Sequence, residues 1–169
     1  MKLLTLNIRH GGGNRVERIL LQLEKQNADV IVLTEFRENK NSFRIKEFLL
    51  EKGYQWQSSC VTERKINSIL LASRKRFEIV SLLDLPKSCS NRALMVKFSD
   101  FVMLAVYFAQ KDAKKVLFDY ISNNCIPLLL PRGIIVGDFN TGKPYLDEKA
   151  KTFSCVSDFV NLEKIGLID

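Results

Sequence analysis

The sequence predicts an α+β layered sandwich, in which helices cover sheets of short strands. Two observations lead to this fold class. The chain opens with a β-α-β pattern over residues 2–34, which is typical of parallel strands joined by a covering helix. Its middle, from residue 54 to residue 109, holds short apolar segments with no helical pattern between them, which favours antiparallel pairing. Parallel and antiparallel segments in one chain are characteristic of layered α+β folds.

Length and composition fit one globular domain of a cytoplasmic protein. The 169 residues match the usual size of one domain, and 46% of them are apolar, which suffices for an ordinary core. No apolar run reaches the roughly 18 residues of a membrane span, and the N-terminal segment lacks the features of a signal peptide. The four cysteines lie far apart, so we expect reduced core thiols rather than a zinc site or disulfides.

The charge balance favours an anionic partner. The chain has 26 basic and 19 acidic residues, which gives a net charge of +7. Such a charge attracts polyanions such as nucleic acid through their phosphates. The same charge on a small domain also serves solubility, so composition alone does not identify the partner.

The first elements follow from the spacing of apolar residues. Residues 2–8 are expected to form a buried strand, and residues 30–34 a second one that is too apolar to alternate, as expected when both faces of a strand are covered. Between them, apolar residues up to Leu23 recur at helical spacing, so we expect a helix with Asn14 as its N-cap. A second helix is expected to end at Gly53, because glycine is the usual C-terminal stop.

The rest of the chain continues with strands and then returns to helices. The predicted strands of the middle lie within residues 54–60, 67–73, 76–85, 92–98 and 101–109. Residues 99–101 are short enough for a hairpin connection. We expect a helix over residues 112–124, a buried strand over 133–137 and a final helix over 156–166, from the same periodicity.

Three of the apolar runs end in an oxygen-bearing side chain. The first ends at Asn7, the second is followed by Glu35, and the run 133–137 is followed by Asp138 and Asn140. Mg²⁺ prefers oxygen ligands and keeps several waters, so one or two carboxylates suffice to hold it. Asp and Asn after a strand also commonly form a simple turn. The three strand ends together favour a metal site, with the amides orienting a carboxylate or holding a phosphate oxygen.

The segment "GDFNTGKP" also resembles a phosphate-binding loop of the G-x-x-x-x-G-K type. That loop requires Ser or Thr after the lysine to hold magnesium, whereas this chain has Pro144 there. Asp138 would also place a negative charge inside a loop that binds phosphates. We therefore prefer the metal site to a nucleotide-binding loop.

The sequence resembles the endonuclease/exonuclease/phosphatase superfamily of magnesium-dependent phosphoesterases. The resemblance rests on "LLTLNIRHGGG", "ADVIVLTEFR", "INSILLAS", "RALMVKF", "LAVYFAQ" and "GIIVGDFNTG", which follow the order of the family and span essentially the whole chain. It is strongest to small bacterial members that begin with "NIRHGGG". It implies that residues 1–169 form one such domain, a four-layer α/β/β/α sandwich of two mixed sheets.

The resemblance also implies roles for the polar strand ends. Glu35 would be the principal metal ligand, and Asn7 would lie beside the metal and orient its ligand. Asp138 would complete the metal site and orient or deprotonate the attacking water. Mg²⁺, or Mn²⁺ in its place, would be the cofactor.

Further residues would contact the substrate. By the resemblance, Tyr107 would hydrogen-bond the scissile phosphate and Asn140 would contact it and hold the surrounding network. Arg92, at the start of a predicted strand, would approach a substrate phosphate. Gln110 stands where the family usually has an Asn, after Ala109 in place of a Pro, and its longer amide would serve the same contact.

The largest departure from the family lies at the C-terminus. The family continues with further strands that carry an Asp and an "SDH" motif, whose histidine contacts the phosphate, and this sequence has no such segment. The resemblance therefore implies a C-terminally truncated domain whose second sheet is incomplete and has an unpaired edge. The one histidine of the chain, His10, stands beside three glycines, and we interpret it as a loop or capping residue.

The sequence thus predicts an enzyme that hydrolyses phosphodiester bonds, with nucleic acid as the expected substrate. Two alternatives stay open. The chain is a catalytically inactive or partner-dependent remnant that binds nucleic acid or protein, with a partner chain completing the sheet. Or it is a phosphomonoesterase or lipid-phosphate hydrolase on the same scaffold.

Overall fold

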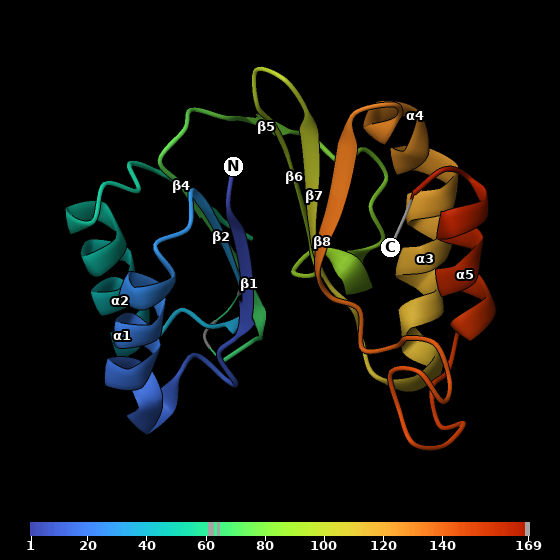
Figure 1. Cartoon of the computed structure of the whole chain (residues 1–169), viewed down its shortest axis with the longest axis horizontal. Coiled ribbons are helices and arrows are strands. Elements are labelled where there is room, and N and C mark those ends of the chain that lie inside the picture. Colours follow the sequence, from blue (N-terminus) through green and yellow to red (C-terminus); the bar gives the residue numbers. More distant parts are fainter. Residues whose placement is uncertain (61–62, 64, 168–169) are drawn as a thin grey trace.

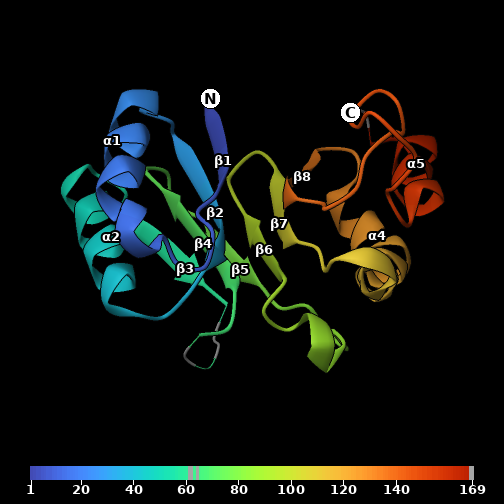
Figure 2. The same cartoon turned by 90° about the horizontal axis from the view of Figure 1, so that it is seen from below.

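The computed structural model describes residues 1–60, 63 and 65–167. Two four-stranded sheets face each other, and helices lie on their outer sides, so the layers follow the order helix, sheet, sheet, helix (Figure 1). Figure 2 shows the same layers from below. Each sheet combines parallel and antiparallel pairs. The predicted α+β fold, a four-layer sandwich of two mixed sheets, is confirmed.

The first sheet contains the N-terminal strands and is covered by two helices. Its strands, in spatial order, are β1 (Leu3–Asn7), β2 (Val30–Phe36), β4 (Ser68–Ser73) and β3 (Trp56–Ser59). The parallel pair β1–β2 is the one that the β-α-β pattern predicts. The covering helices are α1 (Val16–Gln26) and α2 (Lys40–Glu51). Leu23, Ile45 and Leu49 of these helices are buried against Ile31 and Leu33 of β2.

The second sheet is built from the middle and C-terminal segments. Its strands, in spatial order, are β5 (Glu78–Val80), β6 (Ala93–Lys97), β7 (Val102–Tyr107) and β8 (Gly133–Asp138). The predicted hairpin joins β6 to β7. The outer helices are α3 (Lys115–Tyr120), a π-helical turn (Ile121–Cys125), α4 (Ile126–Leu129) and α5 (Val156–Lys164).

The apolar space between the sheets holds them together. Val32 of the first sheet and Val96 and Met103 of the second belong to one buried cluster in this space. β8 also contacts β1 and β2 across the sandwich. The C-terminal ends of β1, β2 and β8, which carry the predicted polar side chains, therefore lie at the same end of the molecule.

Two strands that the sequence predicts to be buried lie at the edges of their sheets. β1 is exposed at Thr5 and Asn7, and β8 is only half-buried at every position. Each has a hydrogen-bonded neighbour strand on one side only within the described part of the chain. Apolar composition identified them as strands but did not indicate how many neighbours each has.

The helix ends agree only partly with the prediction. Gly53 follows α2 with a φ of +87° and its N–H donates to Leu50 O, as expected for a helix stop. The predicted cap at Asn14 is wrong. A 3₁₀ turn (Gly13–Arg15) precedes α1, so the helix begins at Val16 and Arg15, which makes no side-chain capping bond, occupies the N-cap position.

The cysteines of the chain are free thiols that lie in or near the core. Cys60, Cys89 and Cys125 are buried, Cys155 is half-buried, and all four are unpaired. Burial raises the pKa of the Cys60 and Cys125 thiols to about 11, so these two are inert at neutral pH. In the described part of the chain, no helix has the length and apolar character needed to cross a membrane.

Candidate active site

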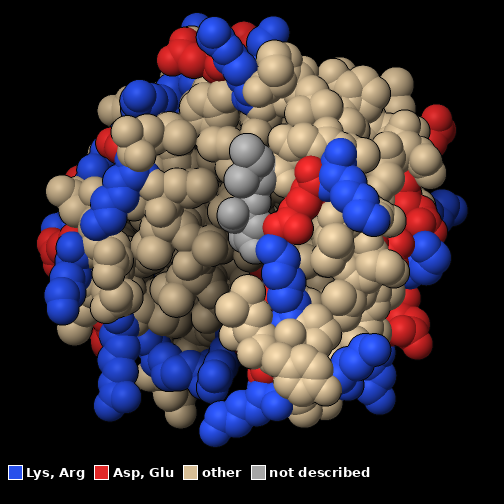
Figure 3. Space-filling model, turned by 45° about the vertical axis from the view of Figure 1, so that its right-hand side comes forward, with Lys and Arg blue, Asp and Glu red and all other residues tan. Residues whose placement is uncertain are grey.

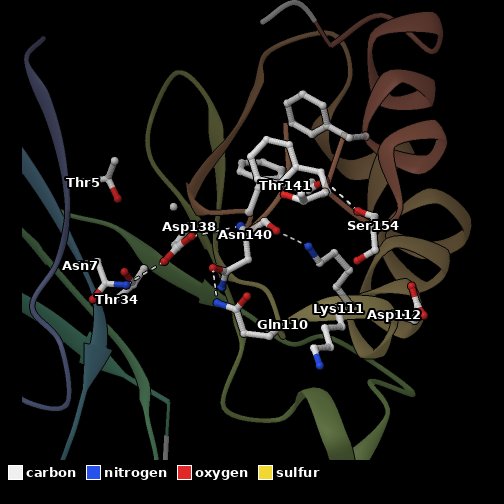
Figure 4. Close-up of a pocket in the computed structure, with 16 residues that line it drawn as sticks. Thr5, Asn7, Thr34, Gln110, Lys111, Asp112, Asp138, Asn140, Thr141 and Ser154 are labelled. Carbon is white, nitrogen blue, oxygen red and sulfur yellow. Dashed lines mark hydrogen bonds between the residues drawn. The ribbon is translucent and has the colours of Figure 1, made fainter. Parts of the chain in front are cut away.

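The side-chain amide of Asn7 joins two carboxylates from different sheets. Its Nδ2 donates to Glu35 Oε1 at 2.9 Å and to Asp138 Oδ2 at 2.8 Å. Asn7 is the last residue of β1, Glu35 is the last residue but one of β2, and Asp138 is the last residue of β8. The structure therefore brings together the three strand ends that the sequence singles out, and Figure 4 shows Asn7 directed toward Asp138.

A β-bulge places Glu35 in this arrangement. The pairing of β2 with β4 shifts register between Thr34 and Phe36, and Glu35 has a left-handed φ of +55°. A bulge of this kind re-aims a side chain and commonly occurs beside active sites. The bulge also leaves the Glu35 carbonyl to accept from Gly11 N at 2.7 Å, which ties β2 to the glycine-rich turn after β1.

Hydrogen bonds keep the Glu35 carboxylate ionised. Partial burial alone would raise its pKa, but three donors act against burial: Asn7 Nδ2, the His10 N–H at 3.0 Å from Oε2, and Asn67 Nδ2 at 3.2 Å from Oε2. Together with the nearby imidazole of His10, they hold the pKa of Glu35 below its usual range. The group is therefore a charged oxygen donor at neutral pH.

Asp138 lies where β8 approaches β7 very closely. The preceding residue, Gly137, has a φ of +143°, and a Cβ there would lie 1.9 Å from the carbonyl oxygen of Val106. Only glycine fits this approach. The Phe108 N–H donates to Asp138 O at 2.8 Å, so the backbone of Asp138 is held while its carboxylate reaches Asn7.

Asn140 organises the loop after β8. Its N–H donates to Asp138 Oδ1 at 3.1 Å, and its Nδ2 donates to Phe108 O at 2.8 Å. Its Oδ1 accepts from Gln110 Nε2 at 2.5 Å, and its carbonyl accepts from Lys114 Nζ. The predicted residues Gln110 and Asn140 are thus in direct contact beside Asp138 (Figure 4).

Tyr107 and Arg92 form the neighbouring part of the site. Arg92 lies over the Tyr107 ring, 5.0 Å from its centroid, and Arg92 Nη1 donates to Tyr107 O at 3.3 Å. The Tyr107 hydroxyl accepts from Asn67 Nδ2 at 3.2 Å, and the same amide nitrogen contacts Glu35. Asn67 therefore links the phenol to the carboxylate.

Several residues at the site have a strained backbone. Arg9, His10, Glu35 and Asn140 all have left-handed φ values between +50° and +56°. Such conformations cost about 1–3 kcal/mol each outside glycine, and they persist where the surrounding structure enforces them, often at active sites. Here they aim the N–H of Arg9 at Asn7 Oδ1 and that of His10 at Glu35.

Beside these groups lies an open cavity of about 940 Å³. Asn7, Thr34, Asp138 and Asn140 are among the residues that line it (Figure 4). Lys114 also contributes to the lining. Thr34 is fully buried, and its hydroxyl has no hydrogen-bond partner among the described residues. Buried polar atoms are normally paired, so this hydroxyl is an exception among the polar groups of the site.

The donor set fits a hard divalent cation. No group of three His, Cys, Asp or Glu side chains positioned to hold a metal occurs within the described residues. Magnesium does not need one, because one or two carboxylates and several waters satisfy it. Glu35 and Asp138 provide two carboxylates that share a single amide donor, while the Oδ1 of Asn7 accepts from Arg9 N, so Asn7 fits the role of orienting the carboxylates.

Three residues at the site escape the sequence analysis. Arg37 and Asn67 lie inside the motifs "LTEFR" and "INSILLAS", so their position two residues after Glu35 and just before β4 was a usable signal. Lys114 stands in a lysine-rich run and gave no signal of burial, yet it is only 2% exposed.

His10 does lie in a turn, as the sequence predicts, but its Nδ1 is 3.2 Å from Glu35 Oε2, so it belongs to the site.

The net positive charge of the chain is not gathered in a single patch on the face shown in Figure 3. Lys and Arg side chains are spread over this face, with acidic side chains among them. Among the basic side chains, Arg37, Arg92 and Lys114 contact residues of the site.

Solved structures of several nucleases and phosphatases have an architecture similar to that of this chain. A search with protein-family models and a search of curated proteins find no match. A 3′ phosphatase, NExo, from Neisseria, bound to product DNA hairpin, superposes with a TM-score of 0.77 at 18% identity over 100% of this chain and 72% of its own. An AP endonuclease from Archaeoglobus fulgidus gives 0.72 at 14% identity, over 98% and 69%. ANGEL2, a 2′,3′-cyclic phosphatase, gives 0.58 at 18% identity, over 83% and 52%.

These structures belong to the endonuclease/exonuclease/phosphatase superfamily. The chain therefore has the fold that its motifs predict. At these identities the comparison establishes the fold, and the chemistry has to be argued from the site.

Proposed function

We propose that this protein is a magnesium-dependent hydrolase of phosphodiester bonds in nucleic acid. The observation that carries the proposal is the amide of Asn7, which holds the carboxylates of Glu35 and Asp138 together across two sheets. Carboxylates at rigid strand ends are a suitable mount for a catalytic cation. The similar fold of known phosphoesterases supports the reaction class.

In this proposal, Glu35 and Asp138 hold the cation, and Asn7 lies beside it and orients both carboxylates through its Nδ2. When bound, Mg²⁺ neutralises phosphate charge and stabilises the leaving oxygen. Asp138 orients the attacking water and accepts its proton, a role that requires a carboxylate within hydrogen-bond reach of the water. The Asn140 N–H at 3.1 Å from Asp138 Oδ1 fixes the carboxylate for this task.

The other residues would bind the phosphate. Tyr107 offers a hydroxyl that already receives a hydrogen bond from Asn67, so its own proton is free to be donated to a phosphate oxygen. Asn140 and Gln110 contact each other beside Asp138 and would hold the phosphate from the other side. Arg92 would contribute positive charge from above the Tyr107 ring.

The substrate class is proposed from the charge at the site and from the similar structures. Arg37, Arg92 and Lys114 surround a centre with two carboxylates, which suits a polyanionic chain. The Neisseria structure holds product DNA and the Archaeoglobus protein is an AP endonuclease. Nucleic acid is therefore the first substrate to test.

The test is nicking of supercoiled plasmid by the purified chain with Mg²⁺, and with Mn²⁺ in a parallel series. We expect nicking that disappears with EDTA and in Asp138→Asn. The matched control is Asp119→Asn, which removes a carboxylate on the outer helix α3 that pairs with Lys115 and should leave nicking unchanged. A folded protein without nicking would instead support an inactive module that binds nucleic acid or protein.

A phosphomonoesterase is the second candidate. The observation in its favour is that one similar structure is a 3′ phosphatase and another a 2′,3′-cyclic phosphatase. The same residues would act, with the cation and Asp138 unchanged. Release of phosphate from a 3′-phosphorylated oligonucleotide, compared with nicking and with a lipid phosphate ester, would separate the three substrate classes.

The open edge of β8 supports a further proposal, that another chain adds a strand to the second sheet. The outer edge of β8 has no strand partner in the described part of the chain. An adjoining cavity of about 360 Å³ is lined by apolar groups that include Ile134, Phe159 and Leu162. Edges of this kind pair readily with other strands. Light scattering would test a second copy as the partner: a concentration-dependent dimer that Ile134→Lys abolishes supports it, and a monomer throughout contradicts it.

We also propose that the protein works in the cytoplasm. Its four cysteines are unpaired and at least half-buried, which suits a reducing compartment. Fractionation of the producing cells would test this.

A further inference from the structure

Arg37 is held at the site without a carboxylate partner. It follows the end of β2 and lies two residues after Glu35. Its Nε donates to Asn67 Oδ1 at 2.5 Å, and its Nη2 donates to His10 Nδ1 at 2.8 Å. No ion pair of Arg37 occurs among the described residues, whereas Arg44 on the nearby helix pairs with Glu17. Its charge is thus fixed in place by neutral groups and remains uncompensated.

The hydrogen bonds around His10 determine which of its nitrogens carries the proton. Nδ1 lies 2.8 Å from Arg37 Nη2, which can only donate. Asn67 Nδ2, a second donor, lies 3.3 Å away, and Glu35 Oε2, an acceptor, lies at 3.2 Å. The shortest of these contacts is the one with the guanidinium, so we assign Nδ1 as an acceptor from Arg37 and the ring proton to Nε2. No hydrogen bond of Nε2 is found within the described residues, and the side chain is 66% exposed, so this N–H is open to a ligand.

The glycine-rich turn is built to bring His10 against Arg37. Five consecutive residues, 9–13, have left-handed φ values. At Gly11, a Cβ would lie 3.0 Å from the Cβ of Arg37 and 2.5 Å from Asn39 Nδ2. Only glycine permits this approach, and Gly11 N is bonded to Glu35 O. The turn therefore fixes both side chains next to the site carboxylate.

We propose that Arg37 and His10 form an anion subsite that takes a phosphate group of the substrate, beside the centre of Asn7, Glu35 and Asp138. A guanidinium whose remaining N–H groups have no hydrogen-bond partner among the described residues, next to an imidazole N–H, has the chemistry that recognises phosphate oxygens. The inference rests on the proposed function for the identity of the substrate. The subsite itself is a property of these two side chains and of Asn67, which orients Arg37.

The chain offers a selective probe, because His10 is its only histidine. The imidazole NMR signals of a protein without a histidine tag therefore report on the subsite alone. We would titrate inorganic phosphate, a dinucleotide and a glycerophosphodiester separately, in EDTA, at constant pH and ionic strength. These arms distinguish free phosphate, a nucleic-acid phosphate and a lipid headgroup.

We expect the His10 signals to move saturably with at least one of these anions. Arg37→Gln should weaken that binding about tenfold or more, since a charge-assisted hydrogen bond is lost, and Arg37→Lys should weaken it less. Arg132→Gln is the matched control. It removes an equal charge at residue 132, just before β8 begins and therefore at the opposite end of that strand from Asp138, and should leave the titration unchanged.

Two results would overturn the subsite. One is a wild-type protein whose His10 signals do not respond to any of the three anions. The other is a response that persists unchanged in Arg37→Gln, with dispersed amide spectra showing that the variant is folded. Because the titration needs neither metal nor turnover, the subsite can fail while plasmid nicking succeeds, and nicking can fail while the subsite binds.

Discussion

The amide of Asn7 is the group on which the geometry of the two site carboxylates depends. Replacing it by alanine removes both hydrogen bonds, to Glu35 and to Asp138. We expect Asn7→Ala to lower the nicking rate by about 10²–10³-fold, the usual cost of losing a preorganised polar group at a reacting centre.

Stability should hardly change, because Asn7 is exposed and such substitutions usually stay within about 0.5 kcal/mol. Thermal unfolding measured beside the nicking rate checks both expectations. Asn161→Ala, an exposed position on α5, is the control. A rate equal to that of the wild type would show that the bridge has no catalytic role.

The lowered pKa of Glu35 predicts a pH dependence of stability in the absence of metal. A carboxyl whose pKa is lower in the folded protein than in the unfolded chain stabilises the fold where it is ionised. This contribution is fully present above the unfolded value of 4.5 and is lost as the pH falls through the folded value. Urea unfolding in EDTA should therefore show an acid loss of stability that is smaller in Glu35→Gln. Equal profiles of stability against pH in the wild type and in Glu35→Gln would show that the hydrogen bonds to Glu35 do not lower its pKa.

The site residues that end apolar runs could be predicted from the sequence. The site residues that lie outside these runs, and whose side chains meet only in the folded protein, could not. Asn7 and Asp138 stand out because a polar side chain interrupts an apolar pattern. Asn67 and Arg37 belong to the site because their side chains hydrogen-bond to each other, although they are far apart in the sequence. Hydrophobic periodicity within one segment does not reveal such a contact. The ring of His10 joins them through a backbone conformation that spacing does not reveal.

At the scale of elements, Lys114 ties the helical segment before α3 to the loop after β8. Its ammonium donates to the carbonyl of Asn140 from a nearly buried position. Burial lowers the pKa of Lys114, so keeping it charged costs stability at neutral pH. Lys114→Met should therefore leave the melting temperature unchanged or higher, while nicking falls about tenfold because the loop loses its hold. A variant that unfolds more easily than the wild type would contradict this account.

The approach of β8 to β7 is the second feature of this scale that can be tested. In Gly137→Ala, a Cβ would lie 1.9 Å from the oxygen of Val106, in a left-handed backbone. The strands have to separate, so we expect at least about 3 kcal/mol of destabilisation. Urea unfolding gives the free energy. A loss of less than about 1 kcal/mol would mean that the two strands are not held this closely.

Element types were predictable from periodicity, and their environments were not. Each strand of the described part of the chain coincides with a predicted strand segment, although β2 runs two residues and β8 one residue past the predicted end. The predicted helix over 112–124 is instead a longer segment that changes from 3₁₀ to α, π and α geometry between Lys111 and Leu129. β1 and β8 look like central strands because their residues are apolar, but pairing partners are decided by the whole fold.

For the molecule as a whole, the proposal predicts salt-dependent binding of nucleic acid. Contacts between cationic side chains and phosphates release counterions, so the logarithm of affinity falls linearly with the logarithm of salt concentration. For a single-stranded oligonucleotide in EDTA, Arg92→Gln should remove one phosphate contact. The magnitude of the slope of log affinity against log salt should therefore fall by about 1. Fluorescence anisotropy over a salt series measures this. An unchanged slope would show that Arg92 does not contact a phosphate of the bound oligonucleotide.

The four-layer architecture was within reach of the sequence because its motifs occur in the order that the superfamily shows. Each apolar strand specifies a local element, and the resemblance supplies the arrangement of those elements, which the similar structures confirm. The contact of β8 with β1 and β2 across the sandwich depends on packing of the two sheets, so physical reasoning on single segments could not provide it.

The most direct test of metal dependence is the nicking rate over a series of Mg²⁺ concentrations, in the wild type and in Glu35→Gln. The wild-type rate should rise with Mg²⁺ and saturate. In Glu35→Gln, the rate should be lost or should need far more Mg²⁺, because a principal ligand has no charge. Nicking that proceeds without Mg²⁺, or that is the same in both proteins, would contradict a metal-dependent centre at the ends of β1, β2 and β8.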